Sequence, residues 1–71
     1  MLEYSRHARE RMRERGISEQ EVEFCLDNYS ISYKDKKGNS IYIAYLVSGK
    51  RVKVVAKAGS ANPVIIITVA D

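Results

Sequence analysis

The chain has 71 residues, of which 45% are hydrophobic and 30% are charged, so we expect one folded domain over residues 1–71 and not a disordered tail. Twelve lysines and arginines against nine acidic residues give a formal net charge of +3, which favours a polyanion as partner. No apolar run approaches the roughly twenty residues that span a bilayer, so the sequence predicts no membrane helix.

A first helix is predicted over residues 6–15. Ser5 is a suitable N-cap, and Gly16 can adopt the left-handed conformation that ends a helix. A helical wheel divides this segment into three parts. Ala8 and Met12 form a buried stripe. The solvated basic face consists of Arg6, Arg9 and Arg13, and the border between the two consists of His7, Arg11 and Arg15.

A second helix is predicted over residues 19–28. The preceding ISEQEV has the pattern of a capping box, with Ser18 at the N-cap and Glu21 at N3. The helical period places four residues on the inner face: Val22, Cys25, Leu26 and Tyr29. Because Cys25 is the only cysteine, no internal disulfide can form, and we interpret it as a small buried hydrophobe.

From residue 30 onward the pattern alternates, as is typical of strands. We expect strands over residues 30–35, 40–47, 51–57 and 63–70, joined by the turns KKGN and SGK and the loop AGSAN. Short connections predict an antiparallel meander. The predicted fold class is therefore α+β, with two N-terminal helices packed on a four-stranded antiparallel sheet in the order ααββββ.

The predicted sheet has apolar residues on both faces. Val52, Val54 and Ala56 share the face that should contact the helices. Because the second and fourth strands are apolar on the other face as well, a protein partner or a second copy in a homodimer is expected to cover part of it. Nothing near the N-terminus resembles a signal peptide, so we expect a cytoplasmic protein.

The border of the first helix contains the candidate catalytic residues. Histidine is the side chain best suited to proton transfer near neutral pH, so His7 could act as acid or base, while Arg11 could stabilise charge on a phosphodiester as it is cleaved. Alternatively, His7 donates to a backbone carbonyl and Arg11 pairs with a carboxylate, and spacing alone favours this structural role. Glu3, His7 and Glu10 share one helical side, but one histidine and no cysteine pair make a thin ligand set, so no metal or other cofactor is predicted.

The segment HARERMRERGISEQEVEFCL, followed by YKDKKGN, a lysine-bearing valine strand and an apolar last strand, resembles a family of small bacterial and archaeal proteins of unknown function with an HARxRMxxRGI start. That family is in turn similar to the ribonuclease toxins of the RelE and BrnT type. The resemblance implies two helices on an antiparallel sheet, RNA cleavage without a metal ion, and an antitoxin-like protein partner. RelE-type toxins often place a functional arginine or tyrosine near the C-terminus, whereas no lysine or arginine follows Lys57 here.

Three functions remain open from the sequence. The first is a metal-independent endoribonuclease in which His7 and Arg11 are catalytic. Its nucleic-acid-binding residues would be Arg15, Lys53 and Lys57, with Tyr42 and Tyr45 as further stacking groups. The second is a noncatalytic module that binds nucleic acid or protein, and the third is a homodimer in which the motif only locks helix to sheet.

Overall fold

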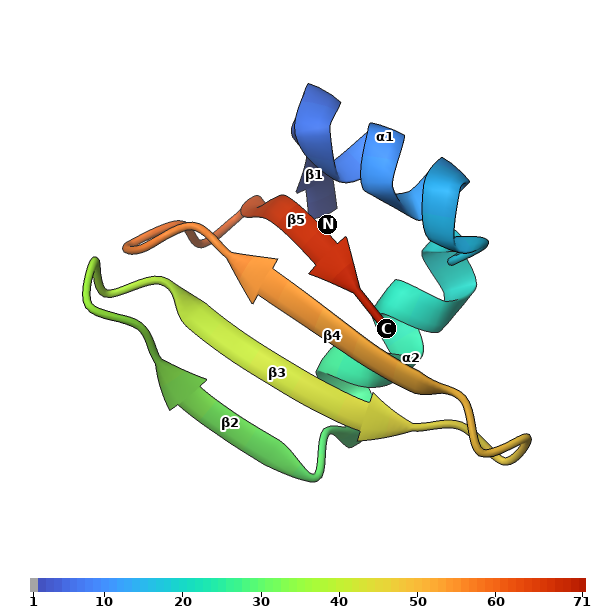
Figure 1. Cartoon of the computed structure of the whole chain (residues 1–71). Helices are drawn as coiled ribbons and strands as arrows, with labels where there is room; N and C mark the ends of the chain where they lie inside the picture. Colours follow the sequence, from blue (N-terminus) through green and yellow to red (C-terminus); the bar gives the residue numbers. More distant parts are fainter. Residues whose placement is uncertain (1) are drawn as a thin grey trace.

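The computed structural model describes residues 2–71 as two helices and a five-stranded mixed sheet, which is an α+β fold (Figure 1). The elements in chain order are β1 (Leu2–Tyr4), α1 (Arg6–Arg15), α2 (Glu19–Asn28), β2 (Ile31–Lys34), β3 (Ser40–Tyr45), β4 (Arg51–Ala56) and β5 (Val64–Ala70). The strand order across the sheet is β1-β5-β4-β3-β2, and β2 to β5 form an antiparallel meander.

The prediction of four antiparallel strands was wrong because the chain begins with an additional strand. β1 pairs parallel to β5, with Leu2 opposite Val64 and Tyr4 opposite Ile66. Its three residues are too few to display the alternation over four to eight residues by which a strand is recognised in sequence.

Ser5 connects β1 to α1 and fixes the start of the helix against β5. Its backbone N–H donates to the Ile66 carbonyl (2.9 Å), and its hydroxyl donates to the Ile67 carbonyl (3.0 Å). The same hydroxyl accepts from the Ala8 N–H (3.0 Å), which is the predicted N-cap bond. The first turn of α1 is therefore held beside the middle of β5.

The ends of both helices follow from local sequence. Gly16 ends α1 with a φ of 64°, a left-handed conformation that glycine adopts without steric cost. The capping box between Ser18 and Glu21 is present at the start of α2. Tyr29 does not lie on the inner face of α2 as predicted. It caps the helix in an extended conformation, is 47% exposed, and packs its ring against that of Tyr42, with 5.0 Å between the centroids and 58° between the ring planes.

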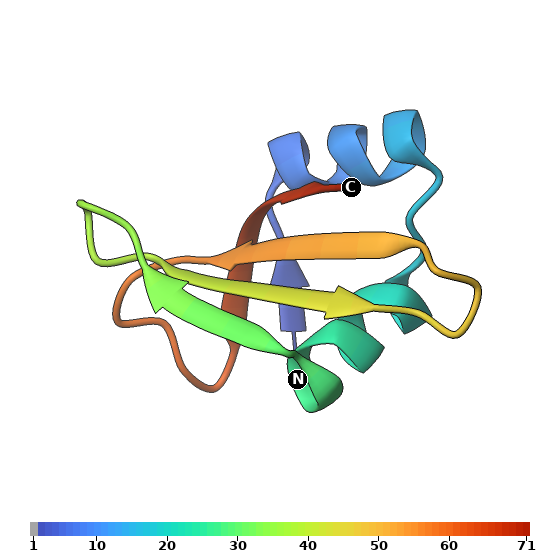
Figure 2. The ribbon, with the colours of Figure 1, turned by 60° about the horizontal axis from the view of Figure 1, so that its bottom comes forward.

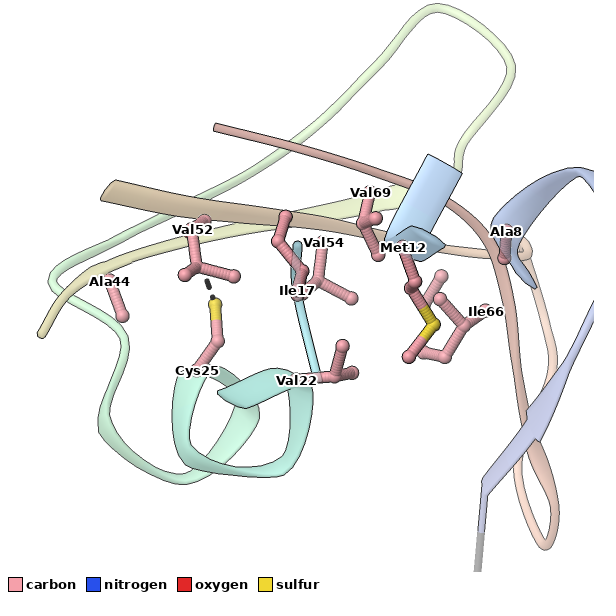
Figure 3. Close-up of a cluster of buried hydrophobic side chains, with 11 residues drawn as sticks. Ala8, Met12, Ile17, Val22, Cys25, Ala44, Val52, Val54, Ile66 and Val69 are labelled. Atoms are coloured by element: carbon pink, nitrogen blue, oxygen red, sulfur yellow. Dashed lines mark hydrogen bonds between the residues drawn. The ribbon is translucent and has the colours of Figure 1, made fainter. Parts of the chain in front are cut away.

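The two helices contact different strands. α1 packs along β5 and β1, whereas α2 covers β3 and β4. In Figure 2, α1 and α2 consequently lie on opposite sides of the β4 ribbon. Their apolar residues nevertheless meet in one core, where Met12 of α1 and Val22 of α2 approach the strand residues Val54 and Ile66 (Figure 3). The buried stripe of Ala8 and Met12 and the inward Val52, Val54 and Ala56 are as predicted.

The face of the sheet turned away from α2 is called the open face below. The register places these residues on it: Ile31, Tyr33, Ile41, Ile43, Tyr45, Arg51, Lys53, Val55 and Thr68. A β-bulge after Val55 adds Ile67, which packs against a small cluster of Ile41, Ile43 and Val55. These three are 4–8% exposed, so each contributes a small apolar area to the surface of the open face, whereas Ile31, Tyr33 and Tyr45 are about half exposed.

Candidate nucleic-acid interface

The predicted catalytic residues lie in the first two turns of α1. His7 is exposed, and its side chain makes no hydrogen bond or ion pair within residues 2–71. The nearest carboxylate to the half-buried Arg11 is that of Glu14, at 4.0 Å. Of the two contacts in the predicted structural alternative, the one from His7 to a backbone carbonyl is therefore absent within residues 2–71, whereas Arg11 does lie at ion-pair distance from a carboxylate.

Arg15, which follows His7 and Arg11 on the same border of α1, lies next to Asp71, the residue that follows β5. Its guanidinium lies 3.6 Å from the Asp71 carboxylate, and Arg51 donates to the Asp71 carbonyl (3.2 Å). Asp71 thus connects α1 to β4. The charge of Arg15, which was predicted to bind nucleic acid, is offset by this carboxylate.

The remaining arginines of α1 are largely matched by acidic residues as well. Arg6 lies 3.5 Å from Glu10. Arg9 donates to Glu19 of α2 (2.6 Å), and its guanidinium stacks over the Tyr4 ring, 4.3 Å from the centroid. Arg13 is the one arginine of α1 without a carboxylate within 4.0 Å in the described part of the chain. The segment that is most basic in sequence is thus largely neutralised in three dimensions.

The lysines have the opposite environment. Lys50 donates to the Gly16 carbonyl (2.7 Å) and to Glu21 (3.1 Å). None of the other five forms an ion pair in residues 2–71. Four of them lie in or next to the loops at one end of the sheet, and the fifth, Lys53, lies mid-strand in β4 opposite Ile43 and lines a hollow shared with that end. We call this group the lysine end: Lys34, Lys36, Lys37, Lys53 and Lys57.

The side-chain charge is strongly separated between the lysine end and the rest of the chain. Asp35 is the only acidic residue among the five lysines, which gives this region a net charge of +4. The rest of the chain has seven lysines and arginines and eight acidic residues, a net charge of −1, so the two regions add up to the total of +3. The excess positive charge of the molecule therefore resides at the lysine end.

A shallow hollow of about 450 Å³ lies at this end of the open face. Three lysines (Lys36, Lys37 and Lys53), Asp35, Asn39 and the Thr68 side chain stand around it, and its apolar lining consists of Ile41, Val55 and Ile67. Two loops meet beside it, because the Asn39 side-chain oxygen accepts from the Ala58 N–H (2.9 Å).

The β2–β3 loop is organised by Asp35. One carboxylate oxygen accepts from the Lys37 and Asn39 N–H groups (2.9 Å each), and the other accepts from the Asn39 amide (3.1 Å). Gly38 completes the turn with a φ of 84° and donates to the Asp35 carbonyl (3.0 Å). Desolvation raises the pKa of Asp35, but hydrogen bonds from Asn39 and Lys37 outweigh it, so the net pKa is lowered and the carboxylate stays ionised.

The structure brings some predicted site residues together and separates others. Lys53 lines the hollow, and Lys57 is exposed just after β4. At roughly 3.3 Å per residue, Lys57 lies about 20 Å along the strand from Arg51, which shares Asp71 with Arg15. The structure thus separates Arg15 from the predicted binding residue Lys57. Tyr42 lies on the helix-covered side against Tyr29 and cannot face the same surface as Lys53. Tyr45 does lie on the open face and is 53% exposed.

Sequence reasoning missed Lys36 and Lys37, because lysines in a hairpin turn are typical of ordinary solvated loops. The signal that could have found them is their number: KDKKGN has three lysines for one aspartate. Within residues 2–71, no three histidine, cysteine or acidic side chains lie close enough together to hold a metal ion. Neither helix in this range is long and apolar enough to cross a membrane.

Fold and surface together define a small α+β domain with a lysine-rich end on an open sheet face. The chain belongs to the family described as a domain of unknown function (DUF4258), whose family model matches residues 4–71. No curated protein and no solved structure matches this chain.

Proposed function

We propose that this protein binds RNA at the lysine end of its open face. The observation that carries the proposal is the net charge of +4 at the lysine end, where five lysines accompany Asp35 and form no ion pair within residues 2–71. The arginines of α1, in contrast, are mostly paired. Binding to a polyanion releases counterions only where protein cations are free to replace them. The resemblance of the sequence to RelE- and BrnT-type toxins supports RNA as the polyanion.

A pair of charge reversals tests this proposal. Lys53→Glu in the hollow and Arg13→Glu on α1 change the net charge equally, and both positions lack ion pairs in residues 2–71. Binding of a fluorescently labelled RNA, measured by anisotropy, should weaken more than about tenfold in Lys53→Glu and change little in Arg13→Glu. Equal weakening in both, or no RNA binding at low salt, would show the proposal to be wrong.

The exposed His7 favours a second candidate function, cleavage of the bound RNA without a metal ion. Ser5, two residues earlier, bonds to the carbonyl of Ile67, which lines the hollow. The first turn of α1 is therefore attached to a β5 residue that also lines the proposed binding surface. An unpartnered imidazole there can transfer a proton, and the Arg11 guanidinium one turn later can stabilise phosphorane charge.

Cleavage is tested with purified RNA in the presence of EDTA. We expect His7→Ala to reduce the cleavage rate at least about a hundredfold, the lower range for loss of a general acid or base. Its melting temperature should be unchanged, because His7 is exposed and makes no side-chain bond within residues 2–71. Absence of product with the wild type, or equal rates for both proteins, would leave RNA binding as the function.

A further inference from the structure

The hollow at the lysine end combines two surfaces that one kind of ligand would need together. Its lining from β3, β4 and β5 is aliphatic: Ile67 is partly exposed, and Ile41 and Val55, which are 7% and 8% exposed, form the floor beside it. The amines of three lysines stand around that lining. A phosphate alone would use only the lysines, and an apolar molecule would use only the lining.

A nucleotide unit presents both features, a flat base and a charged phosphate. The hollow, of about 450 Å³, is shallow and open to solvent, so it can hold one flat group against its lining without enclosing the rest of a strand. A base reaches such a surface only when it is unstacked, because paired bases present their edges in the grooves and keep their faces inside the helix.

The loop that supplies two of the lysines is fixed before any ligand arrives. The bonds of Asp35 within the loop and the bond from Ala58 to Asn39 hold its backbone on both sides. Binding therefore requires ordering of lysine side chains but not of the loop itself, which lowers the entropic cost.

We propose that the hollow binds one unpaired nucleotide, with its base against the Ile41–Val55–Ile67 lining and its phosphate among Lys36, Lys37 and Lys53. This inference rests on the proposed RNA binding and adds its selectivity. The protein binds single-stranded RNA in preference to a duplex, and a mononucleotide occupies the same hollow as the strand.

NMR titrations of the full chain with three probes test the inference: uridine 5′-monophosphate, ribose 5-phosphate and inorganic phosphate. The nucleotide should shift amide signals of residues 35–41, 53–55 and 67–68, and should bind about tenfold more tightly than ribose 5-phosphate because the base buries apolar surface. Equal affinity of nucleotide and ribose 5-phosphate, or shifts confined to other residues, would overturn it.

A matched pair of variants separates the base contact from general destabilisation. Ile67→Ala removes part of the lining, whereas Ile31→Ala makes the same change on the open face outside the hollow. Only Ile67→Ala should weaken the nucleotide, and neither should alter ribose 5-phosphate binding. If both variants weaken the nucleotide equally, the base does not use this lining.

RNA binding itself distinguishes failure of the inference from failure of the proposed function. A single-stranded RNA should bind more tightly than a blunt duplex of the same length. If both bind equally well and Lys53→Glu weakens both, the lysine end is an RNA site but the nucleotide hollow is wrong. If neither binds at low salt, the proposed function fails together with the inference.

Discussion

The salt dependence of RNA binding can be predicted from the five unpaired lysines. For single strands, the slope of log K against log salt concentration is about −0.7 per phosphate neutralised. If each of the five lysines contacts one phosphate, the slope is about −3.5, and affinity should fall about 130-fold between about 50 and 200 mM salt.

Two double variants locate the contacts that produce this slope. Lys36→Gln with Lys37→Gln should reduce it to about −2.1, which is a loss of about 18-fold over the same range. Arg6→Gln with Arg13→Gln removes the same total charge from exposed positions of α1. Because α1 is not part of the proposed contact, its slope should stay near the wild-type value.

The assay is fluorescence anisotropy with a labelled single-stranded RNA at a series of salt concentrations, after thermal melts have shown that all three proteins fold alike. If the arginine double variant flattens the slope as much as the lysine double variant, the RNA contacts α1 and the reasoning from unpaired charge is wrong. A wild-type affinity that does not depend on salt would refute polyanion binding altogether.

Two further predictions concern stability and thiol chemistry. Hydrogen bonds from the Ser18 backbone and from Lys50 lower the pKa of Glu21 in the folded protein. The ionised Glu21 carboxylate therefore stabilises the fold fully at pH values above its ordinary pKa of 4.5. This stabilisation is lost as the pH falls through the lower pKa of the folded state. Urea unfolding should show Glu21→Gln less stable than wild type by under about 1 kcal/mol at neutral pH, with the difference vanishing in acid, while Glu23→Gln has no such effect. Burial raises the pKa of Cys25 to about 11, so the thiol is protonated at neutral pH. Mass spectrometry should show that iodoacetamide modifies Cys25 at neutral pH only when denaturant is present. Rapid modification of the native protein would contradict the burial of Cys25.

The sequence predicted the helices well because their ends are encoded locally. The Ser5 cap, the left-handed Gly16 and the capping box of Ser18 and Glu21 each involve residues at most a few positions apart, so a short window contains the whole interaction. β1 could not be predicted in this way. Its stabilising partner, β5, lies about sixty residues away, and three residues show no period of their own.

The candidate site was only partly predictable for a similar reason. Lys53 and Lys57 could be assigned to a strand face from alternation, but the hollow requires β2–β3 loop residues to meet β4 and β5. That meeting depends on the Asn39–Ala58 bond between two loops, which no spacing rule reveals. The position of Tyr42 was ambiguous because both sides of β3 are apolar, and the structure places it against Tyr29.

Charge pairing explains why the most basic segment of the sequence is not the most basic surface. α1 has five arginines, but Glu10 and Glu14 are spaced to meet Arg6 and Arg11 on the helix itself, and the fold brings further carboxylates to Arg9 and Arg15. In the β2–β3 hairpin, the single carboxylate, Asp35, is engaged by loop N–H groups and by the Asn39 amide, and the neighbouring lysine amines form no ion pair within residues 2–71. Affinity for a polyanion follows the cations that remain unpaired after folding, and within residues 2–71 most of those are the five lysines of the lysine end.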